Sequence, residues 1–346
     1  MRANYDGSNL VFIACQPRSG STLLQRILGT HPSIHTVSEP WVMLHPTYAL
    51  QENGVQAEYD ANLARTGLEL FLGELPKGRR DYLEGLSRMF GYLYERVLQN
   101  TDAHFFLDKT PRYYFILPEI RRIFPEARFI LLFRNPLAVL SSIFRTWVRG
   151  DLLKIARYQT DLLHAPHFLL EGKTELGDAT TSIEYEDLVQ DSRSEMRRIC
   201  QHIGLDFEPG MIEYGREKNK WKFGDPEKVY EHSRPVTSSL QKWARTDDAQ
   251  EWRLLRDYAE QLGEDTFEHL GYEYGTCLQT LEAQRPTSAE LRYTFSLDWL
   301  LNKKKNDRAC WERYVVRLFH EMRGNGISGV AHCIGNRVRS RIGRYG

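Results

Sequence analysis

A short loop near the start of the chain has the residues that could bind an anion. The apolar run 10–15 is followed by Gln16-Pro-Arg-Ser-Gly-Ser-Thr22 and then by leucines at helical spacing. A tight turn between a buried strand and a helix aims several backbone N–H groups at one point, where the helix dipole adds partial positive charge. Arg18 adds a planar guanidinium group inside the same loop, which suits a tetrahedral oxyanion. The loop therefore predicts a site for a tetrahedral oxyanion, and nucleotide phosphates are the usual occupants of such loops.

This loop differs from the common ATP- and GTP-binding loop. The motif G-x-x-x-x-G-K-[ST] would need Gly at Cys15 and Lys at Ser21, and only Gly20 and Thr22 fit it. The positive charge comes from Arg18 instead. An ordinary helix-capping turn, with Ser21 or Thr22 as the cap, is the alternative structural interpretation.

A second anion-binding element follows a later strand. The run 127–133 ends directly before Arg134, and Ser142 comes eight residues later, on a predicted helix. An arginine at the end of a strand and a hydroxyl group at this spacing can converge on one phosphate, the first by charge and the second by a hydrogen bond. The chain therefore has two candidate anion-binding elements, which follow two separate strands about 115 residues apart.

The two segments resemble the donor-binding elements of the sulfotransferases that use 3′-phosphoadenosine 5′-phosphosulfate (PAPS). The first resembles the phosphosulfate-binding loop of that family, and the second resembles the element that holds the 3′-phosphate of the donor. Three further segments agree with the resemblance, which covers about residues 10–270: Asp108-Lys-Thr-Pro111, Tyr185-Glu-Asp-Leu188 and Ser238-Ser-Leu-Gln-Lys-Trp243. Tyrosylprotein-type and bacterial sulfotransferases are the members with the most similar motifs.

The resemblance implies roles for individual residues. Arg18, Lys109 and the backbone of residues 18–22 would offset the charge that builds up on the leaving phosphate, because sulfuryl transfer should resemble phosphoryl transfer. Because Arg and Lys supply this positive charge, no metal is expected. The residues implied in donor binding are Arg18, Ser19, Gly20, Ser21, Thr22, Arg134, Ser142, Tyr185, Ser238 and Lys242.

The acceptor must lose a proton, so a base should face the sulfur atom. Glu39 comes 17 residues after Thr22, where the chain should return to the carboxyl edge of the sheet, and its position matches the glutamate base of tyrosylprotein sulfotransferases. Cytosolic small-molecule sulfotransferases use a histidine instead. Glu39 is the predicted base, and the histidines that stay open as alternatives are His45, His104, His164 and His167.

Strand-like and helix-like segments alternate along the chain. Strand-like runs lie at 10–15, 104–107, 127–133 and 179–185, and helix-like stretches lie at 57–73, 81–99, 112–123, 136–148, 187–203 and 247–263. This alternation predicts an α/β fold with three layers, in which helices cover both faces of a central parallel sheet. The P-loop-like phosphosulfate-binding loop would then lie at the carboxyl ends of the strands. A long irregular stretch near 215–240 is predicted to be a loop.

Composition narrows the possible classes of protein. The 346 residues include 46 Lys and Arg against 46 Asp and Glu, 41% hydrophobic residues, and five cysteines without a C-x-x-C pair. These values exclude a disordered or collagen-like chain, and they indicate neither a disulfide framework nor a cysteine zinc site. Residues 302–346 contain eleven Lys and Arg against three Asp and Glu, so residues 1–301 are acidic. An acidic body argues against binding of long nucleic acids.

The chain is predicted to have two parts, an α/β sulfotransferase domain at 1–275 and a basic, mainly helical appendage at 276–346. In the appendage, residues 308–322 place four apolar side chains on one helix face, which would pack on the core; contact with a membrane surface is the less favoured alternative. No apolar run approaches the roughly 20 residues of a membrane-spanning helix, and residues 1–9 do not resemble a secretory leader. A cytoplasmic location is therefore expected.

The leading hypothesis is a PAPS-dependent sulfotransferase that acts on a hydroxyl or amine group of a small-molecule or carrier-bound acceptor. A P-loop kinase or NTPase is the first alternative, and the missing P-loop lysine argues against it. The second alternative is a nucleotide-binding protein without catalysis, which would need neither Glu39 nor Lys109. Segments 41–75 and 145–175 are expected to shape the acceptor pocket.

Overall fold

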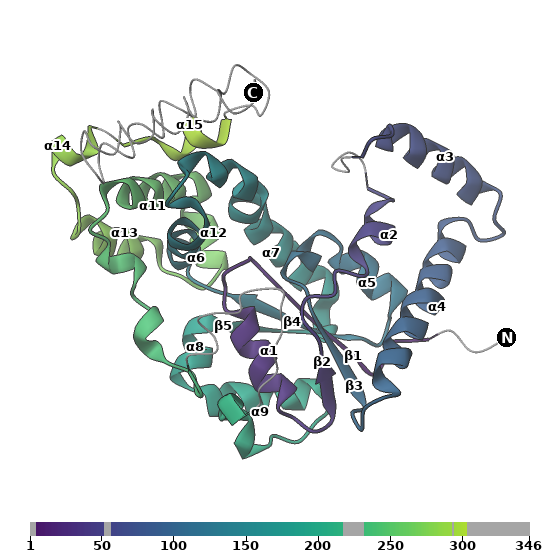
Figure 1. The fold of residues 1–346 in the computed structure, drawn as a ribbon. Helices are drawn as coiled ribbons and strands as arrows, with labels where there is room; N and C mark the ends of the chain where they lie inside the picture. The colour runs from purple at the N-terminus through teal and green to yellow at the C-terminus, as the bar shows by residue number, and fades with distance from the viewer. Residues whose placement is uncertain (1–4, 52–56, 217–231, 293, 303–346) are drawn as a thin grey trace, which may run out of the picture.

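The fold is built on one parallel sheet of five strands. The computed structural model describes residues 5–51, 57–216, 232–292 and 294–302. The strand order is β2-β3-β1-β4-β5 (Figure 1). The strands are β1 (Leu10–Cys15), β2 (Ile34–Thr36), β3 (Phe105–Lys109), β4 (Arg128–Phe133) and β5 (Thr180–Glu184). The predicted α/β fold with a central parallel sheet is confirmed, and four strands fall on the predicted runs. β2 was not predicted, because its three residues are too few to form an apolar run.

Helices cover both faces of this sheet. Side chains alternate between the two faces along a strand, so Leu10, Phe12 and Ala14 of β1 pack into one apolar cluster, and Val11, Ile13 and Cys15 pack into another. The first cluster includes α4 (Arg79–Leu98), α5 (Leu117–Ile123), α6 (Pro136–Ile143), α7 (Ala165–Leu176) and α11 (Ala249–Leu262). The second includes α1 (Ser21–Gly29), α8 (Tyr185–Gln190) and α9 (Ser192–Ile203). The predicted three layers are therefore present.

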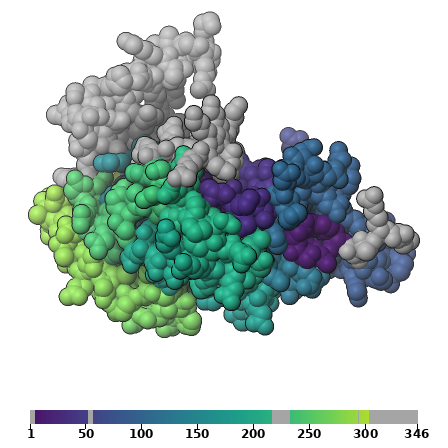
Figure 2. All heavy atoms as spheres, turned by 90° about the horizontal axis from the view of Figure 1, so that it is seen from below, coloured from purple at the N-terminus to yellow at the C-terminus, as the bar shows by residue number. Residues whose placement is uncertain are grey.

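The remaining helices lie at the periphery of the sheet. They are α2 (Leu44–Tyr48), α3 (Ala61–Gly73), α12 (Glu264–His269), α13 (Tyr274–Glu282), α14 (Ser288–Leu291) and α15 (Leu297–Asn302). In Figure 1, α3 lies on top of the α4 side of the molecule, and α11 to α15 lie together on the opposite side. In Figure 2, the purple and blue N-terminal segments pack directly against the teal and green segments of the later chain. Within the described ranges, every helix is too short or too polar to cross a membrane.

The strand order explains why the two predicted anion-binding elements meet. β1 and β4 are hydrogen-bonded neighbours, and Cys15 is paired with Leu132. After β1 the chain continues to β2 at one edge of the sheet, whereas β4 and β5 lie on the other side of β1. Ligands of such sheets bind where the strand order changes direction, at the carboxyl ends of the strands. The loop after β1 and the loop after β4 therefore open at the same place.

Several helices differ from their predicted extents for local reasons. The helix predicted at 187–203 is divided into α8 and α9 at Asp191, whose carboxylate accepts a hydrogen bond from the backbone N–H of Ser194 (3.1 Å) and caps α9. The helix predicted at 136–148 is α6 followed by a π-helical turn, Phe144–Val148. The helix predicted at 112–123 is a 3₁₀ turn, Pro111–Phe115, followed by α5.

The apolar core continues past the predicted domain boundary at 275/276. That boundary lies inside α13, and Cys277 and Leu281 of this helix belong to the same cluster as one face of β1. Three leucines of α15 join that cluster as well. One core therefore extends to Leu301 in the described part of the chain. The basic helix predicted at 308–322 and residues 217–231 of the predicted loop lie outside the described residues.

β3 carries a carboxyl group into the core next to Lys109. Asp108 is 1% exposed, and its carboxylate accepts hydrogen bonds from the hydroxyl groups of Tyr94 (2.7 Å), Tyr113 (3.0 Å) and Thr110 (2.9 Å). Burial raises the pKa of Asp108 to about 6, although these hydrogen bonds act in the opposite direction. An unfolded chain has an Asp pKa of about 3.9. The neutral form of Asp108 therefore stabilises the fold at low pH, and this contribution is lost as the pH rises through about 6.

Asp108→Asn is expected to remove this pH dependence. Between pH 4 and pH 7, the free energy of unfolding of the wild-type protein should fall by roughly 2–3 kcal/mol relative to that of the variant. Urea denaturation of both proteins across this range measures the difference, with the exposed Asp102→Asn as the control substitution. A difference between wild type and Asp108→Asn that stays constant from pH 4 to pH 7 would contradict the expectation.

Candidate functional site

A pocket of about 530 Å³ lies at the carboxyl ends of all five strands. Each strand is followed by residues that line it: Pro17, Arg18 and Gly20 to Leu23 after β1, Glu39 and Trp41 after β2, Pro111 and Arg112 after β3, Arg134 after β4, and Tyr185 after β5. This volume lies in the usual range for a small-molecule site. The pocket brings together ten of the predicted residues, namely Arg18, Gly20, Ser21, Thr22, Glu39, Arg134, Ser142, Tyr185, Ser238 and Lys242. Ser19 and Lys109 do not line it.

The loop after β1 places the start of α1 at the pocket. Gly20 is the N-cap residue of α1, has a left-handed backbone (φ 97°), and provides no side-chain cap. Within the described residues, the first N–H groups of α1 thus have no side-chain acceptor, unlike those of an ordinary capped helix. Neither Ser21 nor Thr22 is therefore the N-cap residue, contrary to the alternative interpretation. Arg18 also has a positive φ (75°), which is rare outside glycine and is frequent at functional sites.

Gly20 is required for two reasons. Its φ strains any residue with a Cβ atom, and a Cβ atom there would lie 2.3 Å from Cδ2 of Tyr185. Gly20→Ala is therefore expected to lower the free energy of unfolding by roughly 2–4 kcal/mol. Gly204→Ala is the matched control, because Gly204 has a similar φ (88°) and open space around it. That variant should lose roughly 1 kcal/mol. Equal losses in urea denaturation would argue against the contact with Tyr185.

Arg134 connects the two anion-binding elements. Its Nη1 donates a hydrogen bond to the carbonyl oxygen of Arg18 (2.9 Å), and its guanidinium carbon lies 4.2 Å from the centre of the Tyr185 ring. Its Nη2 is 3.5 Å from the carbonyl oxygen of Ser239. Burial lowers the pKa of Arg134 from its ordinary value. Among the described residues, the buried Nε of Arg134 has no hydrogen-bond partner. A negatively charged ligand would compensate this partly buried cation.

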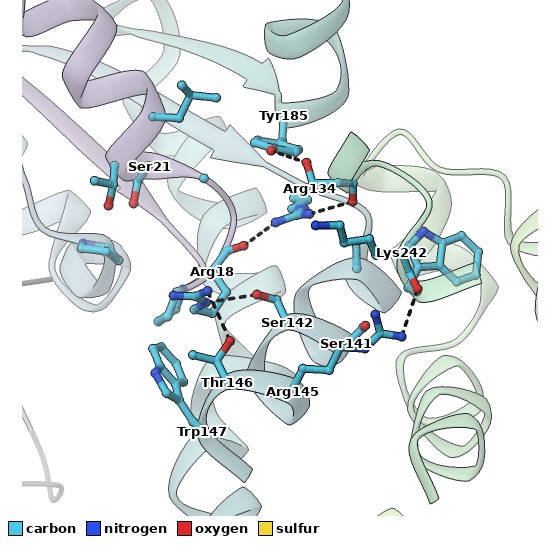
Figure 3. Close-up of a pocket in the computed structure, with 18 of the residues that line it drawn as sticks. Arg18, Ser21, Arg134, Ser141, Ser142, Arg145, Thr146, Trp147, Tyr185 and Lys242 are labelled. Atoms are coloured by element: carbon cyan, nitrogen blue, oxygen red, sulfur yellow. Dashed lines mark hydrogen bonds between the residues drawn. The ribbon is translucent and has the colours of Figure 1, made fainter. Parts of the chain in front are cut away.

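Arg18 reaches from the loop to the helix that carries Ser142. Its Nε donates to Oγ of Ser142 (3.1 Å), and its Nη2 lies 3.4 Å from Oγ1 of Thr146 (Figure 3). Its guanidinium group also lies over the ring of Trp147, at 5.1 Å. The π-helical turn places Thr146 and Trp147 beside Ser142, and π turns are frequent at functional sites. Arg18 and Arg134 thus face one pocket.

A segment after residue 236 forms the opposite wall of the pocket. Oγ of Ser239 lies 2.7 Å from the hydroxyl group of Tyr185. Figure 3 shows the exposed side chain of Lys242 pointing toward Arg134. Ser238 and Trp243 also line the pocket. The cationic side chains of Arg134 and Lys242 therefore converge, and such a pair suits a doubly charged anion such as a phosphate.

Glu39 is held at the other end of the pocket by two donors. Nζ of the buried Lys109 donates to Oε1 of Glu39 (2.7 Å), and Nε1 of Trp41 donates to Oε2 (3.1 Å). The backbone of Trp41 has a positive φ (54°), which is an outlier for a bulky residue. Lys109 thus contacts Glu39, which lines the pocket, and does not line the pocket itself. This pair connects residues 70 positions apart, so no local pattern could have revealed it.

A second buried carboxylate supports this end of the pocket. Asp161 accepts two hydrogen bonds from Arg112 (2.9 and 2.6 Å) and one from the hydroxyl group of Tyr114 (2.7 Å). The Arg112 guanidinium group lies 5.5 Å from the ring of Trp41. Arg112 lines the pocket but was not predicted, although it directly follows the Asp108-Lys-Thr-Pro111 segment.

The four histidines considered as alternative bases lie away from this site. His45, His104, His164 and His167 are exposed, and none of them is among the pocket-lining residues. His232 lines the pocket but was not considered. Within the described ranges, no three His, Cys, Asp or Glu side chains gather where they could hold a metal ion.

Comparisons with known proteins agree on one family. The model of the sulfotransferase family matches residues 10–209, more than half of the chain. Nodulation protein NoeE of Sinorhizobium fredii is 28% identical over 295 residues, covering 76% of this chain and 66% of that protein. A putative protein-tyrosine sulfotransferase of Caenorhabditis briggsae is 25% identical over 217 residues, covering 62% of this chain and 71% of that protein. The chain thus spans just under two thirds of the nodulation protein.

A solved structure shows the same fold. The sulfotransferase domain from the curacin biosynthetic pathway aligns with a TM-score of 0.52 and 19% sequence identity, over 78% of this chain and 99% of that chain. At this identity, the likeness concerns the arrangement of the sheet and helices.

Proposed function

Because the chain belongs to the sulfotransferase family, we propose that it transfers a sulfuryl group from PAPS to a hydroxyl or amine group of a small-molecule or carrier-bound acceptor. The family accounts for sulfuryl transfer, whereas the choice of PAPS as the donor rests on the pocket. The choice of PAPS is supported mainly by Arg134. The buried Nε of Arg134 has no hydrogen-bond partner among the described residues, and its Nη1 donates to the carbonyl oxygen of Arg18 in the loop after β1.

The positive groups of the pocket suit the charges of PAPS. This donor has roughly four negative charges, about two of them on the 3′-phosphate. We assign the 3′-phosphate to Arg134, Ser142 and Lys242, with Ser238 and Tyr185 beside them. The phosphosulfate belongs to the first turn of α1, where Gly20, Ser21 and Thr22 line the pocket. Ser19 would shape the loop instead of contacting the donor, since its side chain is buried and its backbone N–H donates to the carbonyl oxygen of Gln16 (3.2 Å).

Glu39 is the proposed base. It takes the proton of the acceptor while the acceptor atom forms a bond to sulfur, and the bond from sulfur to the bridging phosphate oxygen breaks. The electron pair of that bond stays on the phosphate, and 3′-phosphoadenosine 5′-phosphate (PAP) leaves. Arg18 and Lys109 offset the charge around the transferred group. Trp41 and Arg112, next to Glu39, border the acceptor.

Transfer of label tests this proposal. Purified protein is incubated with PAPS labelled in its sulfuryl group and with fractionated metabolite extracts, and the products are separated by mass. The proposal expects a labelled product together with equimolar PAP, and neither with Arg134→Ala. Wild-type protein that forms no product from PAPS in any fraction, yet consumes ATP with magnesium, would contradict it.

A further inference from the structure

Glu251 of α11 is a buried carboxylate behind the wall of the pocket. Its side chain is 4% exposed. Nε of Arg145 donates to both carboxylate oxygens of Glu251 (2.8 and 3.0 Å). The hydroxyl groups of Ser141 (2.6 Å) and Thr246 (3.0 Å) donate to the same carboxylate. A buried charge is tolerated only with such partners. The donors come from two different segments, the helix that carries Ser142 and the segment that carries Lys242.

Arg145 extends this network to the pocket. Its Nη2 donates to the carbonyl oxygen of Lys242 (3.0 Å) (Figure 3), while Glu251 holds Thr246 four residues further along. The Glu251 carboxylate therefore binds Thr246 directly and holds the backbone of Lys242 through Arg145. Ser141 and Arg145 themselves line the pocket, on either side of Ser142. The backbone of Lys242 is thus connected to Glu251 through Arg145.

We propose that Glu251 is a positioning residue for the donor. It acts through Arg145 to hold the segment 238–246 so that Lys242 and Arg134 face the same phosphate group. This role rests on the proposed function, because it assigns the 3′-phosphate to that end of the pocket. It also keeps the Arg145 guanidinium group bound to protein atoms, so that Arg145 supports the segment instead of binding the donor.

Two variants separate positioning from general stability. Glu251→Gln keeps the shape of the side chain but removes the charge that binds Arg145. Arg145→Lys keeps a cation beside Glu251 but lacks the second donor for the Lys242 carbonyl. Glu260→Ala is the control, because Glu260 lies on the same helix in an exposed ion pair with Arg256. The full-length proteins are titrated by calorimetry with PAP and with AMP, which lacks the 3′-phosphate.

Both variants are expected to bind PAP about tenfold or more weakly, since a hydrogen bond to a charged group is lost. Their affinity for AMP should stay within about twofold of wild type. Amide hydrogen exchange of peptides covering 237–246 should become faster, while exchange in α1 stays unchanged. Glu260→Ala should change neither affinity.

Three results would overturn the proposal. Unchanged PAP affinity in folded Arg145→Lys would show that donor binding does not depend on the contact between Arg145 and the segment 238–246. Equal losses for PAP and AMP would indicate a general structural role. Tighter PAP binding by Glu251→Gln would show that a released Arg145 binds the donor itself. If the wild-type protein binds PAP no better than AMP, the assignment of the 3′-phosphate to this pocket is wrong instead. That result is obtained from the wild-type titrations alone, before any variant is compared.

Discussion

Glu39→Gln is expected to slow sulfuryl transfer by about a hundredfold to ten-thousandfold and to leave PAP binding unchanged. The loss is the usual contribution of a general base, which the amide cannot replace. The substitution keeps the size of the side chain, and the amide oxygen can still accept the hydrogen bond from Lys109 (2.7 Å in the wild type). Turnover is measured with the acceptor that the labelling experiment identifies, and PAP affinity is measured by calorimetry.

The control for this prediction is Glu74→Gln, on the surface at the end of α3. Turnover of Glu39→Gln within about threefold of wild type would remove Glu39 from the reaction. His232, which lines the same pocket, would then be the residue to substitute next. A loss of PAP binding together with turnover would instead place Glu39 in donor binding.

Arg134→Ala should weaken PAP binding by about a hundredfold or more. Two charge-assisted hydrogen bonds to a phosphate would be lost, each with a contribution of roughly 1.5–3 kcal/mol. Arg134→Lys should recover only part of the affinity, because one ammonium group cannot bind the phosphate with the same fork geometry and also contact the Arg18 carbonyl. Calorimetric titration with PAP at fixed ionic strength measures both variants.

Arg128→Ala is the matched control, because Arg128 is the first residue of the same strand, at the opposite end of the sheet from the pocket. It should bind PAP as the wild type does. If Arg134→Ala also binds PAP with wild-type affinity, the 3′-phosphate does not lie at this position, and the assignment of Ser142 and Lys242 is lost with it.

The elements that carry the pocket could be predicted, because their signals are local. β1 is a continuous apolar run that ends three residues before Arg18, and β4 is apolar after Arg128 and ends directly before Arg134. Parallel strands end at the same edge of a sheet, so their loops had to converge once both strands were identified. The family resemblance rests mainly on these two segments, and the three-layer fold follows from the alternation of strand-like and helix-like segments along the chain.

The contacts that support the pocket could not be predicted. Glu39 and Lys109 are 70 residues apart, and Arg145 and Glu251 are 106 residues apart. Their pairing depends on how helices pack on the sheet, which periodicity does not specify. β2 has too few residues to give a pattern, and the backbone of Trp41 is a conformation that its residue type disfavours. Such exceptions to local preference are concentrated where function requires a fixed geometry.

Calorimetric titration of the wild-type protein with PAP, followed by titration with ATP and magnesium, tests the central claim most directly. If Arg18 and Arg134 hold the two ends of one adenosine donor, one PAP should bind per chain, at least about tenfold more tightly than ATP with magnesium. Absence of PAP binding, or tighter binding of ATP with magnesium, would contradict the assignment of PAPS as the donor.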